Sequence, residues 1–273
     1  ALVLDGAVGK NVTYSLKDSS GTSDAVSVTI GNAKTTGLDL TTGTKTLTLT
    51  GIENVSINSA GTGTGTNKVA LVDANAKALT VTGGEALTVT GDLSAALTKV
   101  DASAATKAVD LSGLKTANAV TEIGGAGADS LLASAGLSTL TGGAGNDTFA
   151  FTKNVNGNTY ATVTDFAKGD TLNLADLESM ANAAIADGAF TKITLAPTAA
   201  FADYLDAAAA GNGATTALLS SFQYGGNTYI VVDNNTASTF QNSGTTGDQV
   251  IKLTGLVDLT HAVVSTAGAL TLA

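Results

Sequence analysis

The sequence predicts an all-β-dominated protein, built as a right-handed parallel β-solenoid or β-roll with a C-terminal cap of short helices and strands. Three observations lead to this fold class. Short segments alternate an apolar residue with Thr or Ser, they recur every eight or nine residues, and Gly, Asp or Asn lies between them. A repeat of this length is too short to contain a helix and fits one strand plus a tight turn.

The composition supports an ordered chain with a thin core. Of 273 residues, Ala, Thr and Gly supply 47, 44 and 32, while 44% of the chain is apolar and 13% is charged. High net charge with low hydrophobicity would indicate disorder, and this chain has the opposite balance. Only 4% of the residues are aromatic. Small aliphatic side chains therefore have to form the core, which favours stacked layers over a globular centre.

Charge and residue types exclude several classes of partner and site. The chain has 13 basic residues, all Lys, against 23 acidic ones, a net charge of −10. Nucleic acids and anionic membranes repel such a surface, so neither is an expected partner. With no Cys and one His, disulfides, thiolate metal sites and His-rich zinc sites are excluded. No apolar run is long enough to predict a membrane span.

Residues 1–123 are predicted to form a Thr/Ala-rich solenoid. Leu47-Thr48-Leu49 follows Leu38-Asp39-Leu40 by nine residues, and Asp92, Asp101 and Asp110 begin a series of Asp-x-Ser motifs, also nine residues apart. Asp and Ser commonly cap turns through the backbone, and this interpretation is favoured over calcium ligation, which stays open for the series. The segment Ala1–Lys10 lacks a basic and an apolar region, so no N-terminal secretion signal is expected and we interpret the chain as part of a longer one.

Residues 124–174 are predicted to form a calcium-binding β-roll and its closing strands. Gly124–Leu132 is repeated two nine-residue units later as Gly142–Ala150, and the unit between them keeps Leu140 at the position that Leu131 and Phe149 occupy. If two nine-residue units make one coil, the turns at 124 and 142 stack on each other. The closing strands are expected at Thr162–Phe166 and Leu172–Leu174.

The chemistry of these turns points to Ca²⁺. Glycines allow positive φ and bring backbone carbonyls into a concave turn, and an Asp adds a carboxylate. Such oxygens suit Ca²⁺, which accepts six to eight ligands in irregular geometry. Two carboxylates about 4.8 Å apart repel by roughly 3 kcal/mol at an effective dielectric of about 20, so a shared ion is expected between Asp129 and Asp147. The candidate ligands are Gly125, Gly127, Asp129, Gly142, Gly143, Ala144, Gly145, Asp147 and, two further nine-residue units along, Asp165.

Residues 175–273 are predicted to form a mixed helix and strand cap. Helices are expected at Asp176–Ala186 and Ala199–Ala210, as packing elements and not as binding grooves. A hairpin is expected from Phe222 to Asp233, with its turn at Gly225-Gly226-Asn227. Later strands are expected at Gln249–Leu253 and Leu270–Leu272. Asp233-Asn234-Asn235 is interpreted as a polar loop, with ion binding left open, and His261 is assigned no role.

Several stretches resemble a known family. The two glycine-aspartate nonapeptides, followed by Val163-Thr164-Asp165-Phe166 and Gly169-Asp170-Thr171-Leu172, resemble the RTX β-roll and the strand that closes it, which adds Asp170 to the candidate ligands. The C-terminal region, with Gln223–Tyr229, Ile251–Leu256 and the small, apolar end Leu270–Ala273, is similar to that of RTX surface-layer proteins of Gram-negative bacteria. The departure from the family is that only two nonapeptides are intact, so few bound ions are expected.

The resemblance implies a structural protein of the cell surface. It implies type I secretion through an uncleaved C-terminal signal contained in residues 175–273, folding outside the cell on binding Ca²⁺, and assembly into a two-dimensional lattice. The implied partners are other copies of the chain, the type I secretion machinery and a surface anchor that a preceding N-terminal part would contact. No nucleic acid and no membrane span are implied.

Two alternatives stay open: an RTX adhesin, or the RTX appendage of a secreted enzyme whose catalytic domain precedes Ala1. The sequence itself is not expected to be an enzyme. An H-E-x-x-H zinc motif is impossible with one His, and no G-x-S-x-G motif is present.

Overall fold

The fold is known from a computed structural model that divides into two compact units. Unit 1 comprises residues 1–134 and 141–147, and unit 2 comprises residues 135–140 and 148–273. Each unit is described by itself, and the predicted division into 1–123, 124–174 and 175–273 stays a prediction. The structure describes residues 1–6, 9–93, 95–116, 118–134, 137–153, 159–177, 190–210, 217–242, 247–265 and 267–273.

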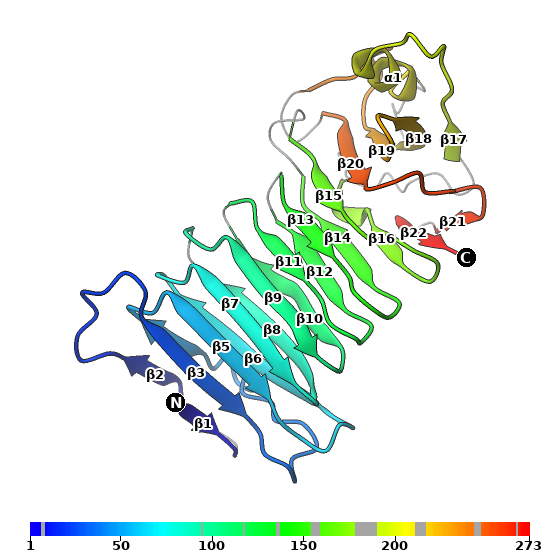
Figure 1. The fold of residues 1–273 in the computed structure, drawn as a ribbon. Coiled ribbons are helices and arrows are strands. Elements are labelled where there is room, and N and C mark those ends of the chain that lie inside the picture. Colours follow the sequence, from blue (N-terminus) through cyan, green and yellow to red (C-terminus); the bar gives the residue numbers. More distant parts are fainter. Residues whose placement is uncertain are drawn as a thin grey trace. The chain divides into compact units, whose positions relative to one another are not determined.

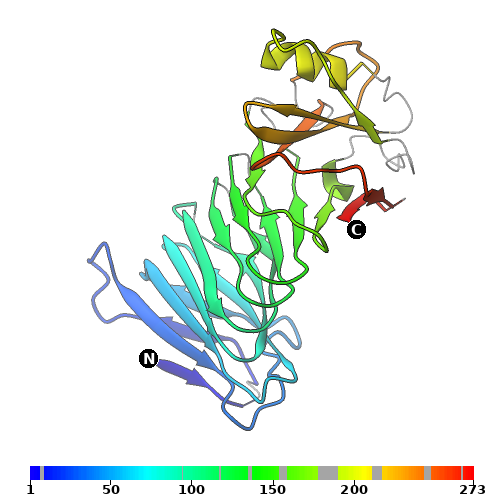
Figure 2. The same cartoon turned by 45° about the vertical axis from the view of Figure 1, so that its right-hand side comes forward.

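Unit 1 is a solenoid of two parallel sheets, and the predicted fold class is confirmed here. Successive strands alternate between the sheets, so the chain winds in coils that both views show stacked in register (Figures 1 and 2). One sheet has the order β1-β3-β5-β7-β9-β11 and the other β2-β4-β6-β8-β10-β12. The strands are β1 (Leu2–Leu4), β2 (Val12–Ser15), β3 (Ala25–Ile30), β4 (Leu47–Thr50), β5 (Asn54–Ser59), β6 (Thr66–Asp73), β7 (Ala78–Gly83), β8 (Ala86–Asp92), β9 (Lys99–Ala105), β10 (Val109–Lys115), β11 (Thr121–Ile123) and β12 (Ser130–Ala133).

The coils of unit 1 are longer than predicted over most of its length. Ala25 pairs with Asn54, Asn54 with Ala78, and Ala78 with Lys99, so the coils shorten along the chain but all exceed two nine-residue units. The prediction of two such units per coil is therefore wrong upstream of the glycine turns. In the coil that begins at Ala25 the extra residues lie mainly in the loop between β3 and β4, whereas in the next two coils they lengthen the strands themselves.

The core of unit 1 consists of aliphatic side chains that stack from coil to coil. The pairing places Val28 beside Ile57 and Ile57 beside Val81, and all three are fully buried. Because inward and outward residues alternate along a strand, every second residue of β3 and β5 is buried. Each such side chain contributes about 1.5–3 kcal/mol of hydrophobic stabilisation.

The Asp-x-Ser motifs of the second and third repeats are side-chain caps within strands. Asp101 Oδ1 accepts hydrogen bonds from the backbone and hydroxyl of Ser103 at 3.1 and 2.6 Å, and Asp110 does the same with Ser112. In both places the register of the strand shifts, as in a β-bulge. The favoured interpretation as backbone caps is confirmed for these two motifs. The first motif contains Ser94, which lies outside the described residues.

Unit 2 combines parallel and antiparallel strand pairs. One sheet has the order β13-β15-β20-β19-β18-β17, where β18, β19 and β20 are antiparallel, and the other has the order β14-β16-β22-β21, where β22 runs antiparallel to β16. The strands are β13 (Thr139–Thr141, whose first two residues belong to unit 2), β14 (Thr148–Phe151), β15 (Ala161–Val163), β16 (Thr171–Asn173), β17 (Phe190–Lys192), β18 (Leu218–Tyr224), β19 (Asn227–Asp233), β20 (Gln249–Leu253), β21 (Ala262–Val264) and β22 (Ala269–Leu272).

The predicted hairpin and the second predicted helix are both present in unit 2. β18 and β19 pair around Gly225 and Gly226, whose φ angles are +56° and +78°. Helix α1 (Phe201–Ala208) packs on these strands through an aromatic cluster in which Phe222 and Tyr229 stack with centroids 5.2 Å apart.

The first predicted helix, Asp176–Ala186, is described only as far as residue 177. There a 3₁₀ turn spans Ala175–Leu177, and the rest of the predicted helix lies outside the described residues. Within the described parts of the chain, no helix is long and apolar enough to cross a membrane.

Candidate metal centre

The two glycine-rich turns of unit 1 stack on each other at the predicted offset of two nine-residue units. The backbone amide of Ala144 donates to Gly125 O at 3.0 Å, and the amide of Asp129 donates to Asp147 Oδ1 at 2.8 Å. Both turns connect the end of a strand of the first sheet to the start of a strand of the second. The nonapeptides therefore form one continuous corner of the solenoid.

Close backbone approach explains why glycine occupies this corner. Gly143 and Gly145 have φ angles of +96° and +138°, which disfavour any side chain. A Cβ on Gly143 would lie 2.3 Å from Gly125 O, and one on Gly145 would lie 2.1 Å from Gly127 O. The carbonyl oxygens of the first turn thus lie directly against the backbone of the second.

The two Asp carboxylates point inward and are almost fully buried. Asp129 and Asp147 are 1% and 2% exposed. Asp129 Oδ1 accepts the amide of Val109 at 2.7 Å and Oδ2 accepts the amide of Gly125. Burial raises the pKa of Asp129, and the hydrogen bonds from Gly125 and Val109 oppose this effect. A cation beside this carboxylate would favour its charged form.

The donor set fits a hard cation that accepts backbone oxygens. Within the described residues no group of three or more His, Cys, Asp and Glu side chains could hold a metal. Two carboxylates from adjacent coils, together with the carbonyls of Gly125 and Gly127, supply oxygen ligands only. Oxygen ligands in an irregular arrangement suit Ca²⁺ and not a transition metal.

Comparison with known families agrees with this chemistry. Residues 123–151 match the family model of the RTX calcium-binding nonapeptide repeat (4 copies). RTX nonapeptide repeats bind Ca²⁺, so Ca²⁺ is the cofactor of residues 124–147, the calcium corner, and the match supports an RTX-type protein. The match includes both glycine turns and the degenerate unit between them. No curated protein matches the chain.

The remaining two candidate ligands lie in unit 2. Asp170 is 3% exposed, precedes β16, and accepts the amide of Ala167 through Oδ2 at 2.8 Å. Asp165 is half-buried between β15 and β16. Thr148 pairs with Thr171, so this coil is longer than two nine-residue units and the predicted stacking of Asp165 on Asp147 is wrong. By strand register it is Asp170 that corresponds to Asp147. Whether either carboxylate binds calcium stays a prediction.

Several buried polar residues of unit 1 were not predicted from the sequence, among them Asn67, Glu85 and Glu122. Asn67 and Glu85 lie at the same corner as Asp129 but in earlier coils, and Glu122 lies in β11 facing the core; they are 0%, 2% and 0% exposed. The run Gly61–Gly65 before Asn67 is a signal for such a corner that the sequence offered. Glu122 lies nine residues before Leu131, so the repeat itself marks it as a core position.

The loop after β19 is a buried polar cluster and not a solvated one. Asp233 and Asp248 are both fully buried, and Asn234 is 3% exposed. Asp248 Oδ1 accepts the amide of Asn234 at 2.8 Å and the side chain of Asn235 at 2.7 Å. Burial raises the pKa of Asp248, which these hydrogen bonds oppose. These hydrogen bonds hold Asn234 and Asn235, directly after β19, against Asp248, directly before β20.

Proposed function

We propose that this chain is a structural surface-layer protein that folds and self-assembles into a two-dimensional lattice on binding Ca²⁺ after type I secretion. The observation that carries the proposal is the pair of stacked glycine-aspartate turns, which matches the RTX calcium-binding repeat. RTX repeat proteins are typically secreted and extracellular, where calcium is available to such turns. The C-terminal resemblance described above supports the surface-layer class.

The outer face of the first sheet supports lateral association. Ala25, Asn54 and Ala78 stack in one row of this face, and Ser27, Ser56 and Thr80 stack in the next. Together they line a shallow groove. Small side chains on a regular parallel sheet allow another molecule to approach the backbone closely, at little cost in side-chain entropy.

Net charge supplies the proposed switch. A charge of −10 opposes the approach of two copies, and each bound Ca²⁺ adds two positive charges. Calcium therefore acts twice: it stabilises the folded glycine-aspartate turns by binding only their folded form, and it lowers the repulsion between folded copies.

Electron microscopy of the chain with millimolar Ca²⁺ tests the proposal. We expect sheets or lattice patches that chelation disperses. Ser56→Arg, in the groove, should prevent assembly without changing calcium binding, whereas Thr88→Arg, which faces outward from β8 on the other sheet, is the matched control. A calcium-loaded chain that stays monomeric at high concentration would contradict assembly through this region and favour an adhesin or an enzyme appendage.

A further inference from the structure

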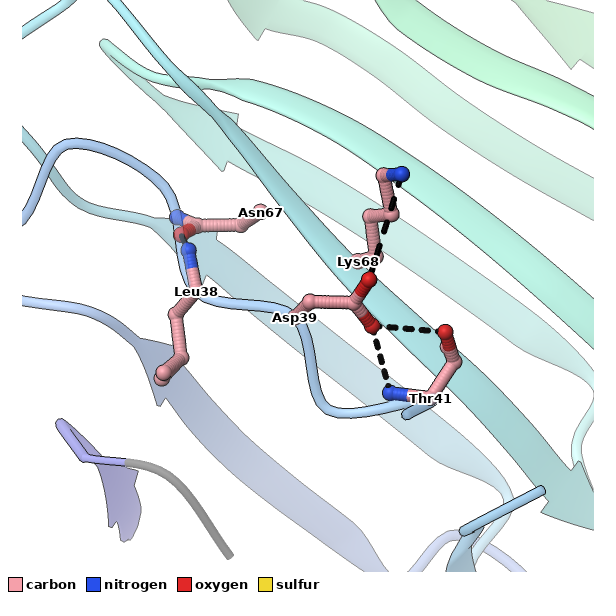
Figure 3. Close-up of polar contacts among 5 residues, drawn as sticks. All are labelled: Leu38, Asp39, Thr41, Asn67 and Lys68. Carbon is pink, nitrogen blue, oxygen red and sulfur yellow. Dashed lines mark hydrogen bonds and ion pairs between the residues drawn. The ribbon is translucent and has the colours of Figure 1, made fainter. Parts of the chain in front are cut away.

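Asn67 lies at the corner of an early coil of unit 1, and the sequence of this coil contains no glycine-aspartate nonapeptide. Asn67 is the second residue of β6 and is fully buried. Its Oδ1 accepts the backbone amide of Leu38 at 2.8 Å, across the gap to the preceding coil (Figure 3). On the outer side of the same coil edge, Lys68 and Asp39 form an ion pair at 3.9 Å. Both side chains are exposed, so the pair contributes little to the stability of the fold.

Asn67 makes the same contact as Asp129 of the calcium corner. The pairing of Asp39 with Lys68 places Leu38 beside Asn67, just as the pairing of Asp110 with Ser130 places Val109 beside Asp129. In both coils an inward side-chain oxygen accepts the amide of the residue stacked beneath it, at 2.8 and 2.7 Å.

The second half of the Asn67 side chain differs in chemistry from a carboxylate. Nδ2 lies 3.1 Å from Ile30 O, 3.0 Å from Ser59 Oγ and 3.0 Å from Ala60 O. Three oxygens from two coils thus surround a side-chain NH₂ group, whose two N–H hydrogens carry positive partial charge. At the calcium corner, carbonyl oxygens of adjacent coils also come together, but the carboxylates bring no donor.

The next coil closes its corner in another way. Glu85 is 2% exposed, and its carboxylate accepts the amides of Gly63 and Gly65 from the coil beneath. A Cβ on Gly61 would overlap Glu85 Oε2, so the loop is shaped around this carboxylate. Two backbone donors satisfy the charge, as in a backbone anion nest.

We propose that Asn67 and Glu85 substitute for bound calcium, so that the coils upstream of residue 116 fold without the ion and template the calcium corner. The amide of Asn67 gives the converging oxygens the positive partner that a cation gives them elsewhere. Calcium then determines whether the glycine-aspartate turns are ordered, whereas the upstream coils of the solenoid are folded with or without it. The proposal requires that Ca²⁺ binds at the calcium corner, but it does not require that the chain assembles into a lattice.

Hydrogen exchange of the full chain, with Ca²⁺ and with a chelator, tests this division. Without calcium we expect the amides of Leu38, Gly63 and Gly65 to stay protected, and those of residues 124–147 to exchange at least tenfold faster than in the loaded protein. Uniform loss of protection across the chain on chelation would overturn the proposal. Uniform retention would overturn it as well.

A single substitution tests the role of the amide. Asn67→Asp removes the donor and leaves a carboxylate among three oxygens, so protection of the Leu38 amide should become calcium-dependent. Asn58→Asp makes the same change on the outward face of β5 and is the control. If protection at Leu38 in Asn67→Asp matches that of the control, or is lost and not restored by Ca²⁺, then the amide does not substitute for a cation.

Discussion

Glu122 is a carboxylic acid at a position that the repeat reserves for an apolar core residue. It lies nine residues before Leu131, and the later members of the series, Leu140 and Phe149, are fully buried as Glu122 is. Oε2 accepts the amide of Leu132 at 3.1 Å, while Oε1 is buried and has no hydrogen-bond partner among the residues that the structure describes. Burial raises the pKa of Glu122 to about 8, opposed by the hydrogen bond from Leu132.

This shift makes the stability of the fold depend on pH. Below the unfolded pKa of 4.5 the carboxyl is neutral in both the folded and the unfolded state, so its burial as a charge does not lower the free energy of unfolding. Between pH 4.5 and about 8 the unfolded chain loses the proton and the folded one keeps it, so the free energy of unfolding falls by about 1.4 kcal/mol per pH unit. Glu122 therefore costs roughly 3 kcal/mol at pH 7.

Glu122→Gln keeps the shape and removes the titration. Denaturant unfolding with saturating Ca²⁺ from pH 5 to 8.5 should show a difference of about 0.8 kcal/mol between the two proteins at pH 5, growing to about 3 kcal/mol by pH 7. Glu122→Leu, which restores the apolar residue of the repeat, should show the same pH profile. A difference between wild type and Glu122→Gln that does not change with pH would refute a buried neutral carboxyl.

Further predictions concern the calcium corner. Asp147→Asn should lose more bound Ca²⁺ per chain than Asp129→Asn by calorimetric titration, because the turn of Asp147 lies against the carbonyls of a preceding glycine turn, Gly125 and Gly127; equal losses would contradict unequal ligation. Gly143→Ala should cost about 1–3 kcal/mol and weaken calcium binding, because its Cβ meets Gly125 O, whereas Gly225→Ala has a positive φ but open space and controls for backbone strain alone. Chelation should reduce the far-ultraviolet β signal without abolishing it; an unchanged spectrum and melting temperature would argue against any calcium-dependent fold.

Local patterns in the sequence predicted the elements that local chemistry determines. The alternation in Leu47-Thr48-Leu49 and the glycines at 225 and 226 correspond to a strand and a hairpin turn, because strand faces and positive φ are properties of a few neighbouring residues. The stacking of Asp129 on Asp147 was also predictable, because two intact nonapeptides fix the offset between them.

Coil length was not predictable in the same way. The register pairs Ala25 with Asn54 in one coil and Thr148 with Thr171 in another, and loop residues without a pattern of their own set the length of each. The interpretation of Asp165 as the residue stacked on Asp147 failed for this reason. Loop insertions cost little free energy, so a solenoid tolerates them while the sheets stay in register.

The buried polar residues of the corner show what the sequence repeat conceals. Every coil that turns from one sheet to the other brings backbone amides and carbonyls to a buried corner where the ladder does not pair them all, and each group left unpaired there costs about 1–3 kcal/mol. Asn67 supplies an acceptor and a donor, Glu85 supplies acceptors to glycine amides, and Asp129 supplies acceptors beside carbonyls that a cation can join. The three residues differ in chemistry and in spacing, so no repeat in the sequence relates them. What they share is that each pairs buried backbone groups at the corner. Only the coils in which a carboxylate lies beside converging carbonyls depend on calcium.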